Sequence, residues 1–186
     1  MSEQTIMLGG LLASAHAITA GVAGALVRFG FIAALAGLTA GLVLIALDGL
    51  AAKQLAELWV TAPPDEKATA VRLVQAEETL NFALRSLFNV LFAGVTFTFY
   101  GLAVALSQQY PRILGGVVVV AGLGGVGTGL IQAYVGESSA LTSFMGLITP
   151  TIITLWLLVM GSCWFGKHLA RLNSLRMFRV SNTRRI

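Results

Sequence analysis

Charged residues and cysteine are scarce in this sequence. Asp, Glu, Lys and Arg together make up 11% of the 186 residues, whereas hydrophobic residues make up 56%. A soluble domain averages about 25% charged residues, so this composition excludes an ordinary soluble domain. The single cysteine, Cys163, cannot form a disulfide within the chain and says nothing about the redox compartment. The composition therefore predicts a membrane protein.

Patterns typical of enzymes are missing as well. The sequence has no His-Glu-x-x-His motif, no cysteine pair, no acidic pair inside an apolar run and no arrangement that suggests a Ser-His-Asp triad. The glycine-rich string GLGGVGTG at residues 122–129 lies inside an apolar run and lacks the lysine of a phosphate-binding loop. We therefore expect a protein that is not an enzyme and that binds no metal.

Five apolar runs are each long enough to cross a membrane as a helix, which takes about 20 residues. They span Thr5–Val27, Phe29–Leu50, Leu84–Leu106, Ile113–Tyr134 and Leu141–Phe165. We predict an all-α bundle of five transmembrane helices with the N-terminus outside and the C-terminus inside. The bundle would occupy residues 1–166, including an external loop at residues 51–79, and residues 167–186 would form a basic amphipathic cytoplasmic tail.

The stretch from Pro64 to Gln109 changes from polar to apolar near Leu80. Neither proline nor glycine lies between Pro64 and Gly94, so we expect one long helix that begins in water and ends in lipid. Proline followed by acidic residues is typical of a helix start. The third transmembrane helix would therefore carry an external helical extension, and the membrane surface should lie near Leu80.

Basic residues are concentrated at the C-terminal end. Six of the twelve lie in the last twenty positions, which contain neither Asp nor Glu. This distribution is the positive-inside signal of a cytoplasmic tail, and it argues against nucleic acid as a partner. We expect Lys167, Arg171, Arg176 and Arg179 to contact anionic headgroups at the inner surface of the lipid bilayer.

Small residues recur at every fourth position in several of the apolar runs. They are Gly9, Ala13, Ala17, Gly21 and Ala25 in the first run, Ala33, Gly37 and Gly41 in the second, and Gly125 and Gly129 in the fourth. Such ridges let membrane helices approach one another closely. We interpret the first two runs as an antiparallel hairpin with a tight turn at residues 28–30.

Polar side chains from four predicted helices lie at one level near the outer surface. They are Asp48, Asn81, Arg85, Asn89, Gln132 and Thr149. Ionisable groups at such a depth suggest a function, and one hypothesis is a vestibule for a small solute or an ion. The other is an Arg85–Asp48 ion pair with amide partners that pins the helices together. We favour the structural pair.

His16 lies in the middle of the first apolar run and is surrounded by alanines. A neutral histidine among small residues leaves room for a haem or chlorophyll, whose metal the imidazole could ligate. The alternative is a neutral histidine that hydrogen-bonds to a neighbouring helix. We favour this alternative and expect no cofactor.

Two short motifs lie in the second half of the chain, Tyr100-Gly101-Leu102-Ala103 at the end of one apolar run and Tyr110-Pro111-Arg112 in the loop that follows. With them, the stretch at residues 85–136 and the string LWLLVMG at residues 155–161 resemble uncharacterised bacterial multi-pass membrane proteins of the domain-of-unknown-function type. The resemblance implies a bacterial inner (plasma) membrane protein and implies no activity.

The small-residue ridges favour one function over the others. A lone bundle of five helices would not obviously use all of them, so we predict a structural or accessory subunit of a homo-oligomer or of a larger membrane complex. The alternatives are a transporter or channel for a small solute or ion, built on the polar cluster, and a subunit that binds haem or chlorophyll through His16.

Overall fold

The computed structural model describes residues 11, 18, 21–108, 110–135 and 140–183, with the backbone alone for residue 141 and for residues 164–183. Every element among these residues is helical. The first long helix comprises α2 (Gly21–Ala46), the π-helical turn η1 (Leu47–Ala51) and α3 (Ala52–Thr61). The second comprises α4 (Lys67–Phe88), the π-helical segment η2 (Asn89–Thr96) and α5 (Phe97–Leu106). Two further helices follow, α6 (Arg112–Val135) and α7 (Ala140–Thr183).

Prolines set the ends of the two long helices. Ala62 precedes Pro63 and has an extended backbone, with ψ of 135°, because a residue before proline is pushed away from the helical region. The long helix predicted from Pro64 begins at Lys67 and runs to Leu106. Pro111 then closes the short loop before α6.

Four helices of the described chain are long and apolar enough to cross a membrane. They are Gly21–Thr61, Lys67–Leu106, Arg112–Val135 and Thr142–Cys163. The predicted count of five is not supported. The first predicted run, Thr5–Val27, lies largely outside the described residues, and so does the predicted position of the N-terminus.

The predicted turn at residues 28–30 is wrong. These residues lie inside α2, which runs unbroken from Gly21 to Ala46. Gly30 is a packing position, because a Cβ atom there would lie 2.8 Å from Cδ2 of Tyr100. The sequence predicts a turn at Gly30, but this glycine lets the aromatic ring of Tyr100 on α5 approach the backbone of α2.

The core lies where α2, α5, α6 and α7 meet. Tyr100, Phe97, Val27 and Val118 are fully buried there, together with Leu11. Phe97 also meets Trp156 of α7 edge to face, with 6.3 Å between the ring centroids. The bundle is therefore organised around α5, whose side chains contact helices on several sides.

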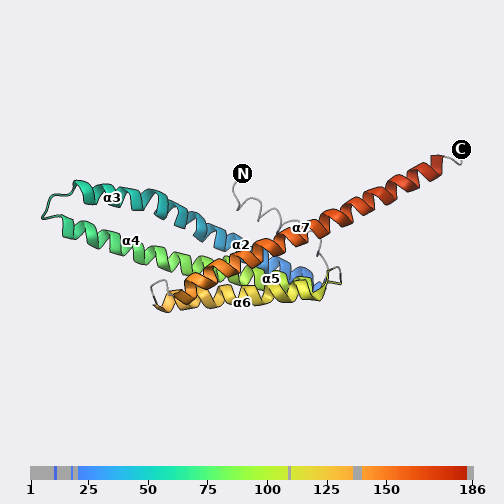
Figure 1. Ribbon diagram of the computed structural model, residues 1–186, viewed down its shortest axis with the longest axis horizontal. Coiled ribbons are helices and arrows are strands. Elements are labelled where there is room, and N and C mark those ends of the chain that lie inside the picture. The colour runs from blue at the N-terminus through green and yellow to red at the C-terminus, as the bar shows by residue number, and fades with distance from the viewer. Residues whose placement is uncertain (1–10, 12–17, 19–20, 109, 136–139, 184–186) are drawn as a thin grey trace.

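Two parts extend beyond this bundle. Figure 1 shows α3 and α4 continuing past the end of α6 as a helical hairpin, and the C-terminal half of α7 projecting at the other end. The basic tail that we predicted as a separate segment at residues 167–186 continues α7 as far as Thr183.

Candidate functional site: a polar network at the base of the α3–α4 hairpin

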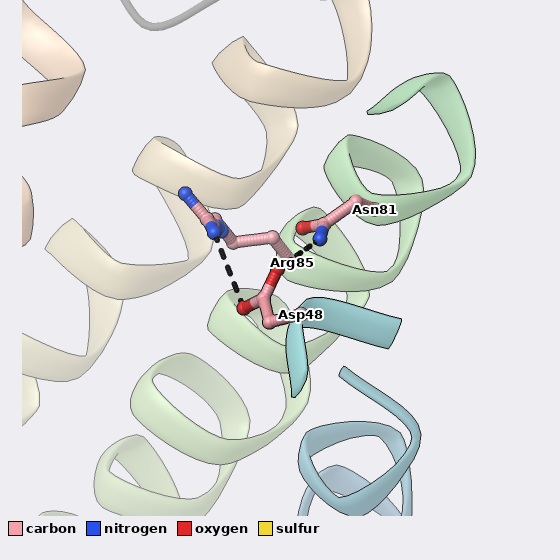
Figure 2. A network of polar contacts seen from close by, with 3 residues as sticks. All are labelled: Asp48, Asn81 and Arg85. Atoms are coloured by element: carbon pink, nitrogen blue, oxygen red, sulfur yellow. Dashed lines mark hydrogen bonds and ion pairs between the residues drawn. The ribbon is translucent and has the colours of Figure 1, made fainter. Parts of the chain in front are cut away.

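One carboxylate joins the two long helices where the hairpin leaves the bundle. Asp48 lies on η1, and Asn81 and Arg85 lie one helical turn apart on α4. Nδ2 of Asn81 donates a hydrogen bond to Oδ1 of Asp48, and a guanidinium nitrogen of Arg85 lies 3.8 Å from Oδ2 (Figure 2). The Arg85 and Asp48 side chains are 48% and 54% exposed. The pair is therefore half-exposed, and such pairs contribute about 1 kcal/mol or less.

A second polar contact lies deeper in the bundle. Nδ2 of Asn89 on η2 donates a hydrogen bond of 2.8 Å to Oε1 of Gln132 on α6. Gln132 is buried, with 8% of its surface exposed. A buried amide needs a partner because water cannot reach it, so this pair ties η2 to α6.

Arg85, Asn89 and Gln132 line one cleft. Its volume is about 380 Å³. Thr128 of α6 and Ser143 of α7 complete its polar wall, while Leu44 and Phe88 contribute apolar surface. The arrangement can accept and donate hydrogen bonds and offers one cation, which Asp48 partly neutralises.

Thr149 does not belong to this network. It lines a separate apolar groove of about 660 Å³ between α6 and α7, beside Ile148 and Gly124. The prediction that Thr149 shares one level with Gln132 is not supported, because Thr149 lies beside Gly124, eight residues earlier on α6. The side to which a helical residue points depends on how the helices cross, and the sequence does not show that crossing.

Two features of the cleft have no clear signal in the sequence. The first is its π-helical geometry, since Asp48 lies on η1 and Asn89 begins η2. Single π-helical turns are frequent at functional sites. The second is the wall from Ser143 and Thr142. Hydroxyl residues are common in membrane helices, so neither residue carried a signal.

Five of the seven predicted small-residue positions that the structure describes lie at helix contacts within the chain. A Cβ atom on Gly37 would lie 2.8 Å from the backbone nitrogen of Phe92, and one on Gly41 would lie 3.1 Å from the ring of Phe88. A Cβ atom on Gly125 would lie 2.8 Å from the carbonyl of Ala93, and one on Gly129 would lie 2.7 Å from the carbonyl oxygen of Ser86. Ala33 of α2 is buried as well.

The first predicted ridge is not a continuous helix face. Gly21 has φ of +65°, a left-handed conformation that interrupts a right-handed helix, so one helix cannot carry the ridge from Gly9 to Ala25. Gly21 and Ala25 are both exposed. Gly9, Ala13 and Ala17 lie outside the described residues, as does His16.

The two tyrosine motifs occupy packing positions. The Tyr100 hydroxyl donates a hydrogen bond of 3.1 Å to the carbonyl oxygen of Leu11. Gly101 lies against the backbone of Gly115, whose carbonyl oxygen would be 2.8 Å from an added Cβ atom. In the loop after α5, burial and then the nearby Cys163 raise the pKa of Tyr110. The first motif therefore holds α5 against its neighbours, and Tyr110 of the second motif is buried in the same core.

The predicted membrane-surface residues lie on the projecting part of α7. Lys167, Arg171, Arg176 and Arg179 fall within its helical backbone, which ends at Thr183. These residues therefore lie on a continuation of the spanning helix. Their contact with anionic headgroups stays a prediction.

Metal ligands do not gather in the described part of the chain, where no group of three or more His, Cys, Asp or Glu side chains could hold an ion. Comparisons with protein-family models, with curated proteins and with solved structures found no match to this chain.

Proposed function

We propose that this protein is a non-enzymatic membrane subunit that acts by helix–helix association, in a homo-oligomer or in a larger membrane complex. The observation that carries the proposal is the α3–α4 hairpin. Its side chains Leu58, Val60, Leu73 and Leu80 are between 47% and 71% exposed. Large apolar side chains exposed outside a membrane favour an interaction with another protein.

The small-residue ridges do not support association between chains. Gly37, Gly41, Gly125 and Gly129 all meet residues of the same chain, so these contacts stabilise the bundle itself. The hairpin is different, because it extends past α6 into a region where the described chain offers no further helix (Figure 1).

The charge distribution supports one orientation in a bacterial inner membrane. The basic C-terminal tail favours the inner side for the end of α7. If the four candidate spans alternate in direction, this orientation would put the α3–α4 hairpin outside and the loop before α6 inside. The acidic residues of the hairpin, which include Glu57 and Glu78, would face the outer aqueous phase.

The proposal is tested by the mass of the native assembly. Extraction from its own membrane in a mild detergent, followed by light scattering with detergent correction, should give a protein mass well above the 19.5 kDa of one chain. An absorption spectrum of the same sample should lack a Soret or chlorin band if His16 holds no cofactor. A single chain in several mild detergents would contradict the proposal.

A vestibule for a small solute or ion is the second candidate function, and the cleft beside Arg85 favours it. The two candidates differ in the expected behaviour of Arg85→Leu. If the Arg85–Asp48 pair is structural, the substitution should lower the free energy of unfolding by about 1 kcal/mol or less, because the pair is half-exposed.

If the cleft admits solutes, the same variant should stay folded and lose uptake of small ions into proteoliposomes. Asp48→Asn is the matched control, because its amide can still accept the hydrogen bond from Asn81. Uptake by the unmodified protein that does not exceed that of protein-free liposomes would rule out the second candidate.

A further inference from the structure

A regular apolar stripe runs along the exposed side of α4. It consists of Leu73, Ala76, Leu80, Ala83 and Leu87. The spacing alternates between three and four residues, which is the heptad repeat of a coiled-coil seam with leucine at the a positions and alanine at the d positions. All five residues are exposed, with values of 47% for Leu73, 52% for Leu80 and 47% for Leu87.

Neither α6 nor α3 covers the stripe, and even beside α6 the side chain of Leu87 is 47% exposed. Gly129 of α6 lies against Ser86 and Val90, and α6 ends six residues later at Val135, a rise of about 9 Å. Since α6 runs antiparallel to α4, the part of the stripe from Leu73 to Leu80 lies beyond its end. α3 packs on another side of α4, where Ala70 is buried.

We propose that a second copy of this chain covers the stripe, so that two α4 helices form a short parallel coiled coil at the outer surface of the membrane. The inference rests on the function proposed above, because it names the partner. Two copies inserted with the same orientation present α4 in the same direction and at the same depth. Parallel, in-register pairing is therefore the arrangement that the membrane itself favours.

Charge complementarity supports the same partner. With Leu73 at position a, Arg72 occupies position g of one heptad and Glu77 occupies position e of the next heptad. In a parallel coiled coil, residues at g and e five positions apart face each other across the seam. Arg72 of each copy would therefore meet Glu77 of the other, twice by symmetry.

Neither of these residues is already paired. Within the described part of the chain no ion pair joins Arg72 or Glu77 to another side chain. The seam is only two heptads long. Confinement of both copies to one membrane raises their effective concentration, which lets a short seam associate.

The test is cross-linking between identical positions. In a Cys163→Ser background, Ala76→Cys and Leu80→Cys should form disulfide-linked dimers in native membranes under mild oxidation. Gln75→Cys and Glu78→Cys are the matched controls, since both positions are exposed on the same turns of α4 but lie off the seam. We expect a dimer fraction several-fold higher at the two seam positions than at the two controls.

Charge exchange tests the pairing across the seam. Arg72→Glu should reduce the dimer fraction of Ala76→Cys, and so should Glu77→Arg, because each places like charges opposite one another. The double exchange should restore it. Retained elution volume in detergent shows that each variant is folded.

Two outcomes would overturn the inference. Equal dimer fractions at seam and control positions would mean random collision, and absent dimers at all four positions would mean that another surface or another protein is the partner. If either result accompanies a native mass well above one chain, the proposed function stands and only the homodimer fails. A single chain without cross-links contradicts both.

Discussion

Replacing Tyr100 with alanine should strongly lower the free energy of unfolding of the bundle. Tyr100 is fully buried in the middle of the bundle, and its ring lies against Gly30 of α2. Truncation of a buried aromatic side chain typically costs about 3–5 kcal/mol, because the neighbours only partly fill the cavity. The free energy of unfolding should be measured in mixed micelles by titration with a denaturing detergent.

Two further variants separate the ring from the hydroxyl group of Tyr100. Tyr100→Phe keeps the packing and loses the hydrogen bond to the Leu11 carbonyl, so it should cost only about 1 kcal/mol. Tyr134→Ala removes a tyrosine that is 91% exposed at the end of α6, and it should change stability little. Equal losses for Tyr100→Ala and Tyr134→Ala would refute a core built around α5.

Gly125→Ala should separate α6 from η2 and lower the free energy of unfolding by about 1–3 kcal/mol, the usual cost of overpacking. An added Cβ atom would lie 2.8 Å from both the carbonyl carbon and the carbonyl oxygen of Ala93. These are backbone atoms of a helix, so they cannot move aside as a flexible side chain could. The whole helix would have to shift.

Gly127 on the same helix is the matched control for Gly125. An added Cβ atom there meets nothing within 4 Å. Alanine is favoured over glycine in a helix by about 1 kcal/mol, so Gly127→Ala should be neutral or stabilising. The same titration compares the two variants, and a Gly125→Ala protein as stable as Gly127→Ala would show that the close approach of α6 is wrong.

Sequence patterning alone was enough for the helical class and for the long helix through α4 and α5. Apolar length determines whether a helix can cross a membrane, because the helix must span the hydrocarbon core of the bilayer. The prolines at residues 63, 64 and 111 determine where helices end, since proline removes a backbone donor and restricts its neighbour. Both properties are local, so they can be read from consecutive residues.

The conformation of individual glycines could not be predicted from the sequence, because glycine has two opposite uses in helices. The sequence predicts a turn at Gly30, but Gly30 lies inside α2 and makes room for Tyr100. The spacing of small residues predicts that Gly21 is part of a helical ridge, but Gly21 has a positive φ angle. Glycine permits both a break and a close contact, and only the neighbouring helix decides which of the two occurs.

In the polar site, too, some features follow from the spacing of residues along one helix and others depend on contacts between helices. The spacing of four residues is enough to predict that Asn81, Arg85 and Asn89 share a helix face, because it returns to nearly the same side of an α-helix. Three other features depend on how the helices pack. Asn89 meets Gln132, Thr149 points into a different groove, and the stripe from Leu73 to Leu87 is left bare. Those outcomes depend on the angles at which helices cross and on where each one stops, and these are set by packing between residues far apart in the chain.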